Sequence, residues 1–229
     1  MRVTLHIYRH DPDSGRAPGY QTVEIEAEPD ETVSGALQYV YEIIDPTLAF
    51  RFVCNMQKCG ECSVVVNGVP CLACEKKVDP EMTIEPLSNL PVIKDLVIDR
   101  NRVISDIFET APFLRHPVSQ DKGAGLSSGI SDHTIKLGMC VECLICQSVC
   151  PVYKESPARF TGPLGIVWLA QMEKDVNNDA WRSALNQHLE LCDLCGKCWK
   201  VCPDEMHILA HVFKRLKLHS GGKDENKKS

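Results

Sequence analysis

Alternating hydrophobic and polar residues mark the start of the chain as a β-hairpin. In two runs every second side chain is apolar, and the six positions are Val3, Leu5, Ile7, Val23, Ile25 and Ala27. Such alternation is typical of strands that bury one face. Residues 11–19 between the runs are rich in turn-forming types, so they predict the connection.

One helix and further strands follow the hairpin. Thr32 or Ser34 is suited to cap a helix that ends near Pro46. Its apolar face is formed by Ala36, Leu37, Val40 and Ile43. The pattern also predicts a strand over 63–66, a tight turn at Asn67-Gly68 and a last strand over 82–86.

The pattern changes to helical periodicity in the second half of the chain. Apolar residues recur three and four positions apart over 164–172, 180–188 and 208–218. The change lies near residues 95–105 and predicts an α+β protein with two domains, 1–98 and 99–220. The polar, charged tail 221–229 is predicted to be disordered.

Composition narrows the function classes. The net charge of −6 and the absence of a basic stripe argue against a nucleic-acid partner. No uncharged run of eighteen apolar residues occurs, so no membrane span is expected. The chain has 13 cysteines but no apolar segment at its start, which favours metal chemistry in a reducing, cytoplasmic compartment over disulfides.

Two cysteine runs share the spacing C-x2-C-x2-C-x3-C-P. They consist of Cys140, Cys143, Cys146 and Cys150 before Pro151, and of Cys192, Cys195, Cys198 and Cys202 before Pro203. This is the bacterial ferredoxin signature, in which the fourth cysteine of each run binds the other run's cluster. It predicts one [4Fe–4S] cluster on Cys140, Cys143, Cys146 and Cys202 and another on Cys150, Cys192, Cys195 and Cys198. Structural zinc is the weaker alternative, because zinc sites use two cysteine pairs.

A third cysteine group lies upstream and reads C-x4-C-G-x-C-x11-C. Its members are Cys54, Cys59, Cys62 and Cys74, and the C-x4-C-x2-C part is typical of plant-type [2Fe–2S] loops. Gly60 suits a loop that folds tightly around a cluster. Cys71 is the alternative fourth ligand, although the spacing favours Cys74. Sheet, helix, cluster loop and hairpin together predict a β-grasp [2Fe–2S] domain followed by a helical ferredoxin-like domain.

No residues for substrate chemistry stand out. The stretch 123–129 is rich in Gly and Ser, but it lacks the flanking strand and helix of a dinucleotide site. His207 is a lone histidine, for which a structural role is the commoner one. We therefore expect no catalytic residue and no flavin site on this chain.

The combination of motifs resembles the iron–sulfur subunit of succinate dehydrogenase and fumarate reductase. Three more segments are similar to that family, namely 69–74 (VPCLAC), 91–96 (PVIKDL) and 160–163 (FTGP). The N-terminal motif alone is also similar to molybdenum hydroxylases, which continue with a different second domain.

The resemblance implies a chain of clusters that relays electrons to or from a separate FAD-containing flavoprotein. The [2Fe–2S] cluster is expected next to the flavin, the Cys140 cluster in the middle and the Cys150 cluster at the distal end. The distal partner would be a membrane anchor with quinone or a soluble cysteine-rich subunit. The location would be cytoplasmic, peripheral on the inner face of the cell membrane through the partners.

Two departures from the family bear on the distal end. Many members lack the cysteine equivalent to Cys195 and bind [3Fe–4S], so a full [4Fe–4S] cluster is expected here instead. Lys154-Glu155 after the first run and Asp193 after Cys192 are poor neighbours for an apolar quinone. A flavoprotein partner with another substrate and a free-standing electron carrier remain as alternatives.

Overall fold

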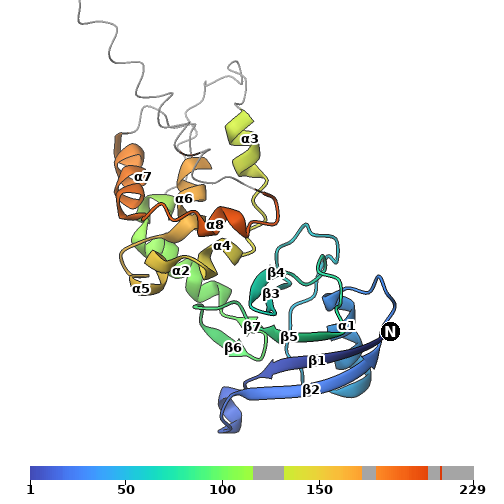
Figure 1. Cartoon of the computed structure of the whole chain (residues 1–229). Coiled ribbons are helices and arrows are strands. Elements are labelled where there is room, and N and C mark those ends of the chain that lie inside the picture. Colours follow the sequence, from blue (N-terminus) through green and yellow to red (C-terminus); the bar gives the residue numbers. More distant parts are fainter. Residues whose placement is uncertain (116–131, 172–178, 206–211, 213–229) are drawn as a thin grey trace, which may run out of the picture. The chain divides into compact units, whose positions relative to one another are not determined.

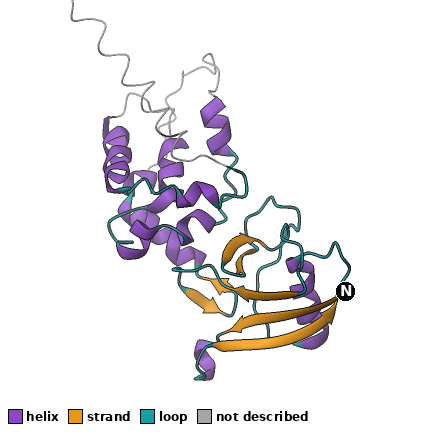
Figure 2. Ribbon diagram, in the orientation of Figure 1, coloured by secondary structure: helices purple, strands orange, loops and turns teal. Residues whose placement is uncertain are grey.

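The computed structural model describes residues 1–115, 132–171, 179–205 and 212 (Figure 1). The chain divides into two units, and one point of division falls within helix α2 (Arg100–Thr110). The first unit contains Met1–Ile104 together with Val141–Val149, and the second takes the described parts of Ser105–Cys140 and Cys150–Ser229. The first unit holds the β-sheet, and the second is helical (Figure 2).

Five strands form one mixed sheet in the order β2-β1-β5-β3-β4. They are β1 (Arg2–Arg9), β2 (Gly19–Glu26), β3 (Ser63–Val66), β4 (Val69–Leu72) and β5 (Glu81–Glu85). Strand β1 runs antiparallel to β2 and parallel to β5. Val3 pairs with Ile25 and Leu5 with Val23, which confirms the predicted hairpin. A short 3-10 turn, η1 (Pro12–Ser14), lies in its connection.

The predicted turn at Asn67-Gly68 is also confirmed. It joins β3 to β4, and both residues have positive φ, 50° and 78°. Two positive φ values in sequence are typical of the type I′ turn, whose twist matches that of a hairpin. A second, two-stranded sheet of β6 (Val92–Lys94) and β7 (Val97–Ile98) was not predicted.

Helix α1 (Val33–Tyr39) begins as predicted but continues differently. Thr32 is its N-cap, and its hydroxyl accepts a hydrogen bond from the Gly35 amide. The chain then forms a π-helical turn, η2 (Val40–Ile44). The wider turn changes the helical register, so Ile43 is 66% exposed and the prediction that it belongs to the buried face was wrong.

Further helical segments follow within the described ranges. They are α2 (Arg100–Thr110), η3 (Pro112–Arg115), α3 (Asp132–Gly138), α4 (Ile145–Ser148), α5 (Pro151–Glu155), α6 (Gly162–Gln171), α7 (Asp179–Leu191) and α8 (Lys197–Lys200). The predicted helices over 164–172 and 180–188 correspond to α6 and α7. In the described ranges, no helix combines the length and the apolar character needed to cross a membrane. The predicted helix 208–218, apart from residue 212, the Gly/Ser stretch 123–129, His207 and the tail 221–229 lie outside the described residues.

The core of the second unit forms around α6, which is apolar on nearly every side. Phe160 and Val167 are buried, and Trp168 stacks on Phe108 with ring centroids 5.7 Å apart. His188 is buried as well, with Nε2 3.2 Å from the Thr110 carbonyl oxygen. Burial lowers the pKa of His188, so this ring is neutral and donates to that carbonyl.

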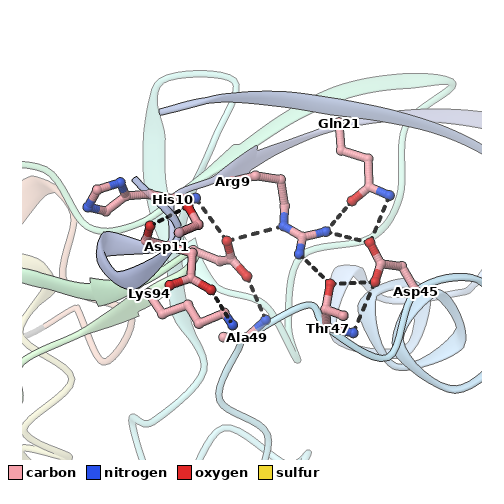
Figure 3. Close-up of polar contacts among 10 residues, drawn as sticks. Arg9, His10, Asp11, Gln21, Asp45, Thr47, Ala49 and Lys94 are labelled. Atoms are coloured by element: carbon pink, nitrogen blue, oxygen red, sulfur yellow. Dashed lines mark hydrogen bonds and ion pairs between the residues drawn. The ribbon is translucent and has the colours of Figure 1, made fainter. Parts of the chain in front are cut away.

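A buried carboxylate organises one end of the sheet in the first unit. One oxygen of Asp95 accepts from the His10 amide at 2.9 Å and lies 3.1 Å from Arg9 Nε, and the other accepts from the Ala49 amide at 2.9 Å. Arg9 also binds Asp45, as Figure 3 shows, with Nη1 2.7 Å from the carboxylate. Asp95 therefore ties together the end of β1, the segment after η2 and the β6–β7 connection.

We expect Asp95→Asn to lower the free energy of unfolding by about 3 kcal/mol, because it removes one partner of a buried ion pair. The side-chain NH2 of the new asparagine would also face the backbone N–H of His10 or Ala49, which needs an acceptor. Urea unfolding followed by circular dichroism measures the change. Asp11→Asn is the control, because the Asp11–Lys94 pair at 2.9 Å is partly exposed to solvent. Equal stability of Asp95→Asn and the wild type would contradict the structural role.

Candidate iron–sulfur cluster sites

The loop that carries Cys54 and Cys59 has an unusual backbone. Asn55, Gln57 and Gly60 all have positive φ, at 50°, 62° and 68°. These left-handed residues turn successive amides inward, which is how backbone concavities for anions and iron–sulfur groups form. The amides of Met56 and Lys58 both donate to the sulfur of Cys54, with N–S distances of 3.4 Å. These bonds, together with the Cys59 thiol, lower the pKa of Cys54 to about 7.

The predicted [2Fe–2S] ligands interact in pairs. Cys54 is hydrogen-bonded to Cys59, and Cys62 to Cys74. Burial raises the pKa of Cys62 to about 12, and the neighbouring thiols of Cys74 and Cys59 contribute to that rise. The structure therefore brings the four sulfurs into one interacting group within the first unit.

Cys71 has different surroundings. It lies within β4, opposite Val64 of β3, while Cys74 follows the end of that strand. Burial raises the pKa of Cys71 to about 11, and the charges that act on it are those of Lys76 and Glu75. Its environment is that of a small buried side chain in a sheet.

The two C-terminal runs repeat one backbone conformation. The residue before the second cysteine has positive φ in both runs, 54° at Glu142 and 56° at Leu194. The residue after it does so too, 64° at Leu144 and 72° at Gly196. Each run then forms a four-residue helix, α4 or α8, before its Cys-Pro pair. The repeat in the sequence is thus a repeat in the backbone, of the left-handed kind that can direct amides toward an anionic group.

Four cysteines from both runs line one pocket in the second unit. They are Cys150, Cys192, Cys195 and Cys198, and apolar side chains of Phe160, Pro163 and Ile166 line the pocket with them. Burial raises the pKa of Cys198 to about 12, and the thiols of Cys150, Cys192 and Cys195 add to the rise. Cys150 reaches this group because it precedes Pro151, the first residue of α5.

The other four cysteines of the runs are divided between the units. Cys143 and Cys146 are buried in the first unit, and Cys140 and Cys202 are partly exposed in the second. Among the described side chains, no three of His, Cys, Asp or Glu are grouped as ligands of a single metal ion.

Two charged residues that were not predicted as site residues contact these loops. Glu61 lies between Cys59 and Cys62, and Arg100 Nε is 3.2 Å from its carboxylate. Arg100 also donates from Nη2 to the Glu142 carbonyl oxygen at 2.8 Å. The position of Glu61 between two ligands was an available signal. Nothing in the sequence marks Arg100, because its partners lie far away along the chain.

Comparison with known proteins shows which domains the chain contains. Residues 4–105 match the model of a 2Fe-2S iron-sulfur cluster binding domain, and residues 136–206 match that of a 4Fe-4S dicluster domain. The fumarate reductase iron-sulfur subunit of Mycobacterium tuberculosis is 30% identical, over 96% of this chain and 98% of its own. This chain belongs to the family of fumarate reductase and succinate dehydrogenase iron–sulfur subunits.

Two further relatives place the chain within the family. A chain of the Mycobacterium smegmatis Sdh1 complex superposes with a TM-score of 0.75 at 25% identity, covering 99% of both chains. One subunit of the fumarate reductase (CoM/CoB) of Methanothermobacter marburgensis is 31% identical over 94% of this chain. The present chain spans only 44% of that relative.

The donor chemistry fits the clusters of this family. Each predicted set offers sulfur ligands, and each combines two buried cysteines with two that are more exposed. Burial disfavours free thiolates here, but bound iron reverses that preference by stabilising them. Amides that point at sulfur complete the match, since such bonds stabilise cluster-bound thiolates.

Gly196→Ala should disturb the distal cysteine group. An added Cβ would lie 2.3 Å from Trp199 Nε1, at a φ that costs a non-glycine residue about 1–2 kcal/mol. We expect reduced iron and sulfide content after anaerobic reconstitution. Gly138→Ala is the matched control, because its Cβ would meet nothing within 4 Å. A full complement of iron in Gly196→Ala would show that the loop tolerates the change.

Proposed function

We propose that this chain relays single electrons between a flavoprotein subunit that holds FAD and a distal redox partner. The observation that carries the proposal is the pocket lined by Cys150, Cys192, Cys195 and Cys198. It joins the fourth cysteine of one run to the first three of the other, as the crossed ferredoxin pattern requires. Substrate chemistry is assigned to the flavoprotein, because this chain offers sulfur ligands and no acid–base group beside a substrate pocket.

The proposed ligand sets follow from the sequence pattern, and the interactions among the cysteines support the [2Fe–2S] and distal sets. The [2Fe–2S] cluster is held by Cys54, Cys59, Cys62 and Cys74. The middle [4Fe–4S] cluster is held by Cys140, Cys143, Cys146 and Cys202, and the distal one by Cys150, Cys192, Cys195 and Cys198. Iron–sulfur clusters take up and release one electron at a time. Cys195 completes the distal set, so [4Fe–4S] is favoured there over [3Fe–4S].

A close approach within the first unit supports the order of the relay. Gly60 lies so near the segment Val141–Val149 that an added Cβ would be 2.3 Å from the Val141 carbonyl oxygen. The same Cβ would be 2.9 Å from the Cα of Cys143, a middle-cluster ligand. The loop of the [2Fe–2S] ligands and the segment of the middle ligands are thus in direct contact, which favours transfer between these two positions.

Exposed apolar residues support partners near two of the sites. Phe52, Val53 and Met56 surround Cys54, and Val53 and Met56 are each 65% exposed. We propose that this surface contacts the flavoprotein. It belongs to the proposed β-grasp domain, residues 1–98, and the proposed helical domain comprises residues 99–220. At the distal site, Leu194 is 57% exposed beside Cys195, which is exposed as well. We assign this second exposed position to the distal partner.

The distal partner is proposed to be a membrane anchor or a soluble cysteine-rich subunit. The name of the Methanothermobacter marburgensis relative includes CoM/CoB, and that protein continues well beyond the matched region. Lys154 and Glu155 are exposed charged residues after the first run, which disfavours an apolar quinone pocket there. The complex is placed in the cytoplasm, at the inner face of the membrane if an anchor takes the distal position.

Anaerobic purification of the native complex tests the relay. We expect a large FAD subunit to copurify with this chain. Addition of that subunit's oxidised or reduced substrate should oxidise or reduce all three clusters, and electron paramagnetic resonance measures this change. Cys146→Ser should stop transfer beyond the [2Fe–2S] cluster, while Cys195→Ser should change only the distal signal. A chain that purifies alone, with no flavoprotein, would instead indicate a free-standing carrier. Equal loss of all clusters in both variants would refute the crossed ligand sets.

The fourth [2Fe–2S] ligand can be tested separately. Cys74→Ala should abolish the [2Fe–2S] signal, because it removes one of the four interacting thiols. Cys71→Ala should keep that signal and cost only the packing of a small buried side chain, about 1 kcal/mol. Optical and paramagnetic spectra of the reconstituted chain measure both. Loss of the signal in Cys71→Ala alone would exchange the roles of the two residues.

A further inference from the structure

Three charged side chains form a bridge beside the [2Fe–2S] loop of the first unit. Glu61 places one carboxylate oxygen 3.3 Å from Arg51 Nη1 and the other 3.2 Å from Arg100 Nε. Arg100 is the most enclosed of the three, with a side chain 12% exposed, against 25% for Glu61 and 38% for Arg51. The two arginines and one carboxylate leave a net positive charge next to the predicted cluster.

Arg100 also reaches the segment that carries the middle-cluster ligands. Its Nη2 donates to the carbonyl oxygen of Glu142, which directly precedes Cys143. Glu142 has φ of 54°, so the hydrogen bond holds a carbonyl at a left-handed turn of the cysteine run. A single guanidinium group therefore binds one residue between two [2Fe–2S] ligands and another beside a middle ligand.

A planar guanidinium suits this role better than an ammonium group. Arg100 uses two different nitrogens at fixed angles, one for the carboxylate and one for the carbonyl. Asn89 binds the same segment, Val141–Val149, near its other end, because its side-chain amide donates to the Ser148 carbonyl oxygen at 2.9 Å. With the close approach of Gly60, the bridge fixes the separation of the two cysteine loops.

We infer that Arg100 is a positioning residue that holds the [2Fe–2S] loop against the middle-cluster segment, and that with Arg51 and Glu61 it sets the [2Fe–2S] potential. The inference rests on the proposed electron relay. Charges near a cluster shift its potential in opposite directions according to their sign. Loss of either arginine should lower the [2Fe–2S] midpoint potential, and loss of the Glu61 charge should raise it.

Four variants of the full chain in its purified complex separate the two roles. They are Arg100→Met, Arg51→Met, Arg100→Lys and Glu61→Gln. Arg51→Met is the matched control, because it removes the same charge from the same carboxylate without touching the Glu142 carbonyl. The measurements are the [2Fe–2S] midpoint potential and the power saturation of its paramagnetic signal, which reports the distance to the reduced middle cluster.

We expect both Met variants to lower the potential, but only Arg100→Met to weaken the relaxation caused by the middle cluster. Arg100→Lys should keep the potential near that of the wild type and still weaken the relaxation. Equal relaxation in Arg100→Met and Arg51→Met would overturn the positioning role, and an unchanged potential in Glu61→Gln would overturn the electrostatic one. If Arg100→Met binds no cluster, Arg100→Lys provides the test of the positioning role. Relaxation equal to that of the wild type in Arg100→Lys would overturn that role. A wild-type complex without interacting clusters would instead refute the relay itself.

Discussion

A short loop that aims three sulfur atoms at one point cannot remain in a single right-handed backbone conformation. Both C-terminal runs meet this constraint with left-handed residues on either side of the second cysteine. The first run does so with Leu144, a buried leucine for which positive φ is unfavourable, and the second with Gly196. Packing must therefore hold the first loop in place, whereas in the second loop Gly196 removes the cost at one of the two left-handed positions and Leu194 keeps it at the other. The cysteine geometry, and with it the proposed relay, depends on these turns.

Burial and backbone amides act in opposite directions on the thiols of the cysteine groups. Burial raises the pKa of Cys62 and Cys198 to about 12, so neither is a thiolate at neutral pH unless a cation is bound. Cys54 differs, because two backbone amides lower its pKa to about 7.

Much of this architecture follows from local sequence. The β1–β2 hairpin, the Asn67-Gly68 turn and the Thr32 cap depend on neighbouring residues, and the structure has all three. Ile43 was assigned to the wrong face, because the spacing of apolar residues does not show where a helix changes from α-helical to π-helical hydrogen bonding. The cysteine sets could be proposed from spacing alone, since the motif encodes ligand geometry. Arg100 could not, because a salt bridge between distant segments leaves no local pattern.

The membership of Val141–Val149 in the first unit has a consequence for biosynthesis. A ribosome that has made only the first 104 residues has not yet made all of this unit. Gly60 and Arg100 contact residues 141–143, which are synthesised later. The N-terminal part therefore cannot reach its final packing before that segment has been made. Domains usually fold in order as they are made. Here the last step of the first unit is delayed until the first ferredoxin-type run has been synthesised, which links maturation of its cysteine loop to that of the run.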